Sequence, residues 1–414
     1  MNDQKRMRDL DVVVYGASGF VGVLVAEYLA EHAPEGTRIA LAGRSHAKLE
    51  KVRTRIGVQW PIIVADAADV PALEQLVASA HVVLTTVGPY GKYGRALAHA
   101  CAAAGTDYAD LTGEVLFVRA SAEENHELAR STGARIVHSC GFDSIPSDIG
   151  VHVLHAQVVA DGAGELTDTT MVVTGLRGGV SGGTIDSLRH QIAVTSNDRS
   201  LRRIAASPYS LSPDRAAEPD LGRQEDLVAL PGQAVDPSLR GSLAPFFMAP
   251  YNTRVVRRSN ALRNWAYGRR FRYREVMSVG TTPLSAVLAT GVKLGIGGLY
   301  LGLSLPATRF VLDRILPKPG DGPSERTRRR GHFTVDIFTT TTTGRRYKSR
   351  FKATGDPGYA ATAVMLGESA LALALDRADL PASQGGVLTP ATGIGDALVN
   401  RLRAAGMEIT ASWL

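Results

Sequence analysis

Short apolar runs alternate with longer stretches of helical periodicity along the first 140 residues. Runs at 11–15, 38–42, 61–64, 81–86 and 135–140 predict strands, and the stretches 23–29, 47–56, 71–78, 95–104 and 122–131 predict helices. Strands joined by helical crossovers of this length pair in parallel, because each crossover returns the chain to the same end of the sheet. The fold class expected for this half is α/β, with a doubly wound parallel sheet.

The regular alternation fades after Cys140, where we expect a second domain to begin. An apolar helix is expected from Pro146, since proline is favoured in the first turn, to about Val159. Strand-like runs follow at 169–176, 332–343 and 347–354. Residues 207–245 are rich in Pro, Asp, Gly and Ser and predict a long surface excursion. The last segment, 388–402, resumes helical periodicity.

A glycine-rich turn connects the first expected strand to the first helix. Its three glycines have the spacing that allows a tight turn, close approach of a pyrophosphate, and close packing of helix on sheet. The N-terminus of the helix then faces the phosphates. Such turns also occur without a ligand, but the position on the first strand of a βαβ series favours a dinucleotide. The residues predicted to hold it are Gly16, Ala17, Ser18, Gly19, Phe20, Val21 and Gly22.

The end of the second expected strand indicates which dinucleotide is bound. Arg44 stands where an NAD site usually places an acid against the ribose 2′-hydroxyl, and a guanidinium suits a 2′-phosphate instead. Ser45 and Lys48 add donors, so the sequence favours NADPH; the alternative is that Arg44 is a solvated surface charge. Asp66, after the third strand, is expected to border the adenine unless it only caps a helix.

The loop after the fourth expected strand is the candidate catalytic segment. It reads VGPYGKYG and lies at the carboxyl end of the sheet, where doubly wound folds bind ligands. The backbone at Gly88, Pro89 and Tyr90 is expected to pass the nicotinamide. Tyr90 and Tyr93 are candidate proton donors, although both phenols could instead only wall the pocket. Asp143 is a further candidate.

Composition narrows the setting in which the protein works. The chain has 46 Lys and Arg against 40 Asp and Glu, 44% hydrophobic residues, and two cysteines, Cys101 and Cys140, without a CxxC pair. A disulfide framework and a structural zinc site are therefore not expected, and we predict no metal. The N-terminal residues lack the apolar core of a signal peptide, so we expect a cytoplasmic location.

Arginines are concentrated between Arg254 and Arg274, where eight of them occur without an acid and with aromatic residues interleaved. Such a segment suits an acidic carrier domain, an anionic membrane or, least well, nucleic acid. The alternative is a solvated helix face. We therefore expect no nucleic acid among the partners.

Residues 284–305 form a long apolar run in which Lys293 is the one charge. As a helix this run could cross about 30 Å of hydrocarbon. The central lysine and five glycines argue instead for a segment that lies in a membrane interface or lines an acyl site. Arg309, Arg314 and Lys318 follow it and would suit lipid headgroups, so we expect contact with an anionic lipid surface. A buried core helix and a true span are the alternatives.

Several blocks of the sequence together resemble one known family. The blocks are GASGFVG (16–22), GRS (43–45), TTVGPYGKYG (85–94), TDYADLTGE (106–114) and HSCGFDSIPSDIG (138–150). They resemble the saccharopine dehydrogenase-like oxidoreductases, and in particular the mycobacterial trans-acting enoyl reductase branch. Further blocks at 180–189, 249–273, 331–344 and 385–402 extend the resemblance over nearly the whole chain.

The resemblance implies a Rossmann domain over 1–145, an inserted α+β domain over 146–384, and a C-terminal segment over 385–414 that packs back on the Rossmann domain. It also implies an NADPH-dependent enoyl reductase, which reduces an α,β-unsaturated acyl thioester on the acyl carrier domain of a polyketide synthase, during assembly of phthiocerol-like lipids. The arginines near 254–274 would then dock the carrier. Two alternatives stay open: an oxidoreductase of saccharopine-type amino-acid adducts, and a lipid-associated Rossmann scaffold without catalysis. A homodimer also stays open.

Overall fold

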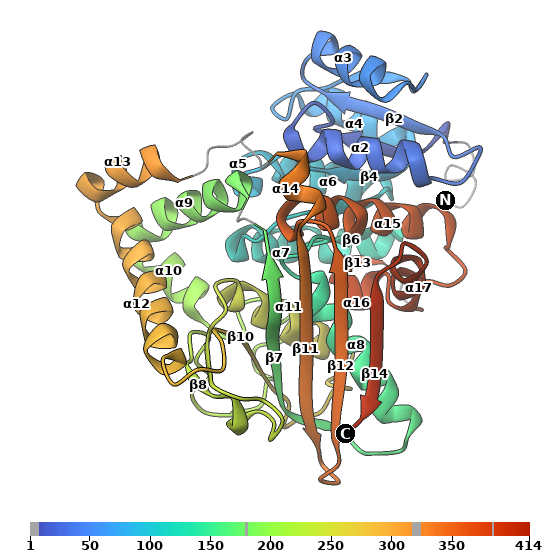
Figure 1. Ribbon diagram of the computed structural model, residues 1–414. Coiled ribbons are helices and arrows are strands. Elements are labelled where there is room, and N and C mark those ends of the chain that lie inside the picture. The colour runs from blue at the N-terminus through green and yellow to red at the C-terminus, as the bar shows by residue number, and fades with distance from the viewer. Residues whose placement is uncertain (1–7, 179–180, 317–323, 383–384) are drawn as a thin grey trace.

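The computed structural model describes residues 8–178, 181–316, 324–382 and 385–414 (Figure 1). Seven strands form a first sheet in the order β13-β6-β5-β4-β1-β2-β3, and every neighbouring pair is parallel. These strands are β1 (Leu10–Tyr15), β2 (Ile39–Gly43), β3 (Ile62–Val64), β4 (Ala80–Thr85), β5 (Asp107–Asp110), β6 (Arg135–Val137) and β13 (Gly386–Leu388). The predicted parallel Rossmann-type sheet is confirmed.

Helices connect the strands of this first sheet, as the periodicity predicted. They are α2 (Phe20–His32), α3 (His46–Ile56), α4 (Val70–Ala78), α5 (Tyr90–Tyr93), α6 (Arg95–Ala104) and α7 (Val115–Thr132). One boundary differs from the prediction, because the strand expected to reach Cys140 ends at Val137. Ser139 has a φ of 69°, which turns the chain away from the sheet.

A second sheet holds seven strands in the order β14-β12-β11-β7-β10-β9-β8. Its members are β7 (Leu166–Arg177), β8 (Leu230–Pro231), β9 (Ser242–Pro245), β10 (Arg272–Ser278), β11 (His332–Thr341), β12 (Arg346–Thr354) and β14 (Glu408–Trp413). β7 and β10 are parallel and the other neighbours are antiparallel. The runs predicted at 169–176, 332–343 and 347–354 correspond to β7, β11 and β12. The predicted surface segment 207–245 contributes β8 and β9, which form the edge of the second sheet opposite β14.

Two buried helices, α8 (Ile145–Ala160) and α11 (Ala249–Leu262), pack in contact with this second sheet. α8 is apolar on nearly all sides and buried over most of its length, as expected for a helix covered by protein all round. Gly150 of α8 lies so close to Ile337 of β11 that a Cβ atom would be 2.6 Å from its Cδ1. α8 therefore lies directly against the strands.

The chain returns to the first sheet before its predicted C-terminal segment begins. A π-helical turn (Pro357–Ala361) leads into α15 (Thr362–Leu375), which packs on α2 and on β1, β4 and β5. β13 then completes the first sheet beside β6, followed by α16 (Pro390–Gly393) and α17 (Asp396–Ala404). β14 leaves again and pairs with β12 of the second sheet. The expected return at 385–414 is thus corrected in two ways: it starts with α15, and its last strand belongs to the second sheet.

The remaining helices stand beside the second sheet, at the left of Figure 1. They are α9 (Gly182–Asn197), α10 (Arg199–Ala206), α12 (Ser285–Ser304) and α13 (Pro306–Ile315). α12 packs against α9 and β9. α14 (Glu325–Arg329) precedes β11, and the short 3-10 turn Gly232–Ala234 lies between β8 and β9. α9, α10 and α12 share one cavity with the glycine turn, which follows the carboxyl end of strand β1.

Candidate active site

The predicted glycine turn has the geometry that a dinucleotide needs. Gly16 has a φ of +87°, and the N–H of Gly19 donates to the carbonyl of Gly16 at 2.9 Å. A Cβ atom on Gly22 would overlap that same carbonyl oxygen, so α2 approaches the turn more closely than any other residue would allow. Within the described residues no side chain caps α2, whose N-cap is Gly19, which leaves its first N–H groups available to a phosphate.

The residues predicted to read the ribose end gather after β2 and β3. Arg44 and Lys48 are exposed, and Ser45 precedes α3 as its N-cap without a side-chain hydrogen bond there. Burial raises the pKa of Tyr15 to about 12, with a further rise from the Asp66 carboxylate and an opposing effect from Arg44. Arg44 and Asp66 therefore lie around the same hydroxyl at the carboxyl edge of the sheet.

Asp66 also has a structural role that the sequence left as an alternative. Its Oδ1 accepts a hydrogen bond from the N–H of Ala68 at 2.9 Å, which shapes the turn before α4. The side chain remains exposed. Both interpretations of Asp66, a turn-forming acid and a neighbour of the bound nucleotide, are compatible with this position.

Tyr90 lines the cavity, but its hydroxyl is committed to the protein. The phenol donates to the carbonyl of Thr85 and accepts from the N–H of Leu111, both at 3.2 Å. Burial raises the pKa of Tyr90 well above its ordinary value. Gly88 and Pro89, which are joined by a cis peptide bond, line the cavity beside it. Tyr90 is therefore a wall of the site, and this geometry does not support its predicted role as proton donor.

Tyr93 lies outside the residues that line the cavity, and 37% of its surface is exposed. The ammonium of Lys92 sits over its ring at 4.9 Å from the centroid. The catalytic role predicted for Tyr93 is corrected accordingly. Tyr90 and Tyr93 are the first and last residues of the short helix α5, and only Tyr90 borders the cavity.

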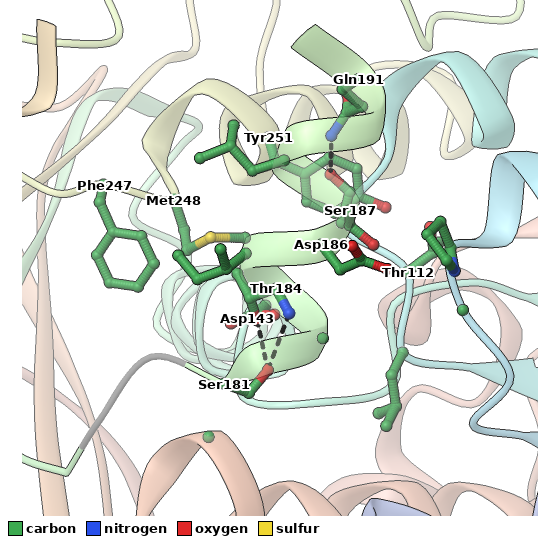
Figure 2. A pocket seen from close by; sticks show the side chains of 18 of the residues that line it. Thr112, Asp143, Ser181, Thr184, Asp186, Ser187, Gln191, Phe247, Met248 and Tyr251 are labelled. Carbon is green, nitrogen blue, oxygen red and sulfur yellow. Dashed lines mark hydrogen bonds between the residues drawn. The ribbon is translucent and has the colours of Figure 1, made fainter. Parts of the chain in front are cut away.

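Asp143, the third predicted catalytic residue, does reach the cavity (Figure 2). It precedes α8 in the turn after β6. Burial raises the pKa of its carboxyl to about 6, against the lowering effect of a hydrogen bond from Thr184. Thr184 belongs to the first turn of α9, which Ser181 caps by accepting from the Thr184 N–H at 3.0 Å. A partly protonated carboxyl at neutral pH can donate a proton, so this group meets the chemical requirement of a general acid.

A second candidate proton donor, a pair of hydrogen-bonded hydroxyl groups that the sequence did not reveal, lines the same cavity. The hydroxyls of Ser139 and Tyr251 form a short hydrogen bond, and both residues are buried. Asp110 holds Ser139 in its left-handed conformation by accepting its N–H at 2.9 Å. Burial raises the pKa of Tyr251 well above its ordinary value, and the Ser139 hydrogen bond opposes that shift. Ser139 and Tyr251 both belong to blocks named in the sequence, but they lie 112 positions apart and no local pattern connects them.

Glu114 was also missed as a positioning residue. Its buried carboxylate accepts the N–H of Tyr90 at 2.7 Å and the N–H of Gly91 at 2.9 Å, and the hydroxyl of Ser187 at 2.7 Å. One side chain thus fixes the loop after β4 to helix α9. The TDYADLTGE block contains it, but no local pattern shows that it faces both segments.

These groups surround a single large cavity of about 1160 Å³. It begins at the N-terminus of α2, passes Gly88 and Asp143, and continues between α9, α11 and α12. Figure 2 shows Phe247 and Met248 on one side and polar side chains of α9 on the other. The far wall is apolar and is formed by Phe247, Met248, Ile296, Leu299, Tyr300 and Leu301.

The arginine-rich segment divides into two parts. Arg254, Arg257 and Arg258 on α11 are buried and bind carbonyl oxygens or Asp226, so the expectation of one continuous docking or solvated face is wrong for them. Burial lowers the pKa of Arg258 to about 10. The exposed arginines of the segment, Arg269, Arg270 and Arg272, come after α11. Composition shows the charge of such a segment but not which side chains are packed.

Comparison with known proteins identifies the family. A model of the saccharopine dehydrogenase NADP binding domain matches residues 12–137. A Mycobacterium tuberculosis protein, provisionally named a trans-acting enoyl reductase, is 54% identical over 97% of both chains. Trans-acting enoyl reductases of Mycobacterium bovis and Mycobacterium ulcerans are 50% and 47% identical, covering 97% and 98% of this chain and 97% and 99% of their own.

This chain belongs to the trans-acting enoyl reductase family. The predictions of an oxidoreductase and of an NADP cofactor are thereby confirmed. Among solved structures, apo saccharopine dehydrogenase (L-Glu forming) of Saccharomyces cerevisiae gives a TM-score of 0.49 at 14% identity, covering 97% of this chain and 99% of that one. Amine dehydrogenase of Mycobacterium smegmatis gives a TM-score of 0.38 at 13% identity, covering 89% and 93%.

Proposed function

We propose that this member of the trans-acting enoyl reductase family uses NADPH to reduce the carbon–carbon double bond of an α,β-unsaturated acyl thioester. The observation that supports the proposal is the cavity, which joins the N-terminus of α2 to a deep apolar wall formed by α12 and by the two residues before α11. A redox cofactor and an apolar chain would meet at its middle, beside Asp143. The names of the relatives point to the same reaction.

The residues of the first sheet fit the cofactor. The Gly16–Gly22 turn leaves room for a pyrophosphate and presents the open N-terminus of α2 to it. Arg44 would pair with the 2′-phosphate, and Ser45 and Lys48 would add donors. When bound, NADPH supplies the hydride that reduces the β-carbon of the double bond. The protein then has to orient the thioester and provide the proton for the α-carbon.

Asp143 is the group that we propose as proton donor. Its carboxyl faces the cavity and is held by Thr184, and its pKa of about 6 leaves part of it protonated near neutral pH. The Tyr251–Ser139 pair is the competing donor, because the same cavity exposes it to substrate. Tyr90 would position the substrate without giving up its proton.

The lining of the cavity disfavours the amino-acid adduct that was left open from the sequence. A dicarboxylic adduct needs cations that converge on it. Among the described residues that line the cavity, Arg202 is the single cationic side chain, and its guanidinium already donates to the carbonyls of Thr195 and Ser196. Asp143 and Asp186, both acids, line the same space. An uncharged acyl chain suits this wall better.

We also propose that the thioester arrives on the acyl carrier domain of a polyketide synthase that makes phthiocerol-like lipids. The exposed Arg269, Arg270 and Arg272 support this, because a carrier domain that is acidic would be attracted to them. Replacing Arg270 and Arg272 by Glu should raise the KM for carrier-bound substrate. The same change should leave the KM for a free thioester unaltered.

The deciding experiment follows NADPH oxidation by the purified full chain with enoyl thioesters, and identifies the product by its gain of two mass units. Turnover with an enoyl thioester and none with a saccharopine-type imine is the expected result. Turnover with the imine alone would reject the reaction, and tight NADPH binding without turnover on either substrate would favour the non-catalytic scaffold.

Cofactor preference gives a separate prediction. Arg44→Ala should raise the Kd for NADPH about tenfold and leave that for NADH unchanged, because only NADPH carries the 2′-phosphate that the guanidinium would pair with. Lys51→Ala, which removes an exposed cation from α3, the helix that follows Arg44, is the control and should change neither value. Equal affinities of the wild type for the two cofactors, by fluorescence titration, would contradict the assignment.

A further inference from the structure

The outer face of α12 and α13 concentrates the exposed apolar surface of the protein. Fifteen large hydrophobic side chains are exposed in the described residues, and eight of them lie between 284 and 315. This short segment therefore holds more than half of them. They are Leu284, Val287, Leu288, Leu294, Leu301, Leu305, Phe310 and Ile315. A concentration of exposed apolar side chains on two neighbouring helices indicates a binding surface.

α12 is apolar on both faces, but only one of them is covered. Ser285, Ala289 and Leu303 are buried on the inner face, and Ile296 and Leu299 line the cavity. The outer face carries Val287 and Leu294, seven positions apart, with exposures of 69% and 71%. Leu301 is also exposed, but it lines the cavity. Four glycines on α12, at 291, 295, 297 and 298, have no neighbour within reach of a Cβ atom among the described residues.

Basic side chains flank this outer face. α10, which borders the same cavity as α12, carries the exposed Arg199 and Arg203 after its N-cap Asp198. On α13, Arg314 stacks over the ring of Phe310, 4.1 Å from its centroid. The charge of Lys293 does not interrupt the apolar stripe, because this residue lines a recess with residues 223–227.

We propose that the outer face of α12 and α13 docks on an anionic phospholipid bilayer, with α12 lying in the plane of the interface. An apolar stripe bordered by arginines is the arrangement that binds such a surface. α12 does not span the bilayer, because its inner face is packed on β9 and α9. That same inner face borders the cavity, so an acyl chain would pass from the bilayer into the site; this last point rests on the proposed function.

The charges argue against a second copy of the chain as the occupant. In a two-fold symmetric contact through the same face, Arg199, Arg203 and Arg314 would lie near their own symmetry mates or one another. The carboxylate at the start of α10, Asp198, is engaged as the helix N-cap, where it accepts the N–H groups of Ser200 and Leu201. An anionic headgroup layer supplies the opposite charge along the whole border.

The test is flotation of the purified full chain with vesicles. We expect binding to phosphatidylcholine vesicles that contain phosphatidylglycerol, much weaker binding to phosphatidylcholine alone, and partial release at 1 M salt, where the Debye length falls from about 10 Å to about 3 Å. Val287→Glu with Leu294→Glu should lower the bound fraction at least about tenfold. Neither residue lines the cavity.

The matched control carries two glutamates at exposed apolar positions elsewhere, Val159→Glu with Leu375→Glu, and should bind as the wild type does. Arg199→Gln with Arg203→Gln should remove the preference for phosphatidylglycerol. Reduction of a short, water-soluble enoyl thioester should be the same in all variants, which separates this proposal from the proposed function.

Four results would overturn the docking proposal. The first is that the wild type does not bind vesicles, and the second is that it binds neutral and anionic vesicles equally. The third is that the wild type is a dimer, and that Val287→Glu with Leu294→Glu converts it to a monomer without changing flotation. The fourth is retention of the protein in cell membranes until detergent is added, since a docked face should be released by carbonate.

Discussion

Two helices of this protein have nearly the same mean hydropathy and opposite surroundings. α12 and the continuous helix Pro357–Leu375, which includes α15, are both long and apolar enough to cross a membrane, with mean hydropathies of 1.5 and 1.4. Yet 72% of the apolar window of the second helix is buried within the protein, against 11% of that of α12. Composition sets what a helix can tolerate, and the contacts around it decide what it does.

Glycines show this difference most directly. A Cβ atom on Gly367 of α15 would be 2.8 Å from Cδ1 of Tyr28, so this glycine allows α15 and α2 to approach each other. Gly295 of α12 meets nothing within 4 Å. The two helices also meet the cavity differently, because Thr362 of α15 accepts the N–H of Phe142, next to Asp143, at 3.0 Å, while α12 contributes apolar wall.

The largest contrast is expected from a charge introduced into each helix. Leu366→Glu should prevent folding or cost more than about 4 kcal/mol, because Leu366 is fully buried and the carboxylate would have no partner. Leu294→Glu should change the free energy of unfolding by less than about 0.5 kcal/mol, because this side chain is exposed. Urea unfolding measures both. Strong destabilisation by Leu294→Glu would show that the outer face of α12 is covered in solution.

The next largest effect concerns Asp143, which the N-terminus of α15 helps to position. The proposed proton donor is the protonated form of this carboxyl, which is present below its pKa of about 6 and is lost above it, so kcat should fall as the pH rises through 6. Asp143→Asn should lower kcat by about 10² to 10⁴ and remove this pH dependence. Tyr251→Phe is the comparison variant. If it removes turnover while Asp143→Asn keeps the pH profile, the Tyr251–Ser139 pair is the donor.

The smallest effect has opposite signs in the two helices. Gly295→Ala should stabilise the protein by about 0.5–1 kcal/mol, because alanine has the higher helix propensity and the added methyl group meets no atom. Gly367→Ala should destabilise it, because the same gain is outweighed by overlap with Tyr28. Thermal melting of both variants gives the comparison. A shift of the same sign in both would mean that the contact with Tyr28 relaxes easily.

The parts of the fold that could be predicted are those encoded locally. Alternating strands and helices indicated the parallel sheet, and the glycine spacing located the cofactor turn before any contact was known. The cavity was different, because Tyr251 reaches Ser139 across 112 positions and Glu114 reaches Ser187 across 73. No periodicity reports such pairs. Tyr90 lines the cavity, as predicted. One hydrogen bond of its phenol comes from the N–H of Leu111, which lies on another segment, so the sequence did not show that this hydroxyl is engaged.

Burial was the other quantity that the sequence did not contain. Arg254, Arg257 and Arg258 have the composition of a docking surface and are packed inside the protein, while the apolar residues of α12 are outside it. In both segments the sequence gives the chemistry of the side chain, and only the neighbouring elements determine whether water reaches it.

The position of β13 has a consequence for the synthesis of this protein. β6 needs β13 as its neighbour, and Arg135 at the start of β6 donates to the carbonyl of Gly393, which is 258 positions later. The first sheet therefore stays incomplete until a segment about 250 positions after β6 has left the ribosome. Until then the edge of β6 is open to other strands, including those of neighbouring nascent chains. The sheet that carries the glycine turn is thus completed only after every strand of the second sheet except β14 has been made.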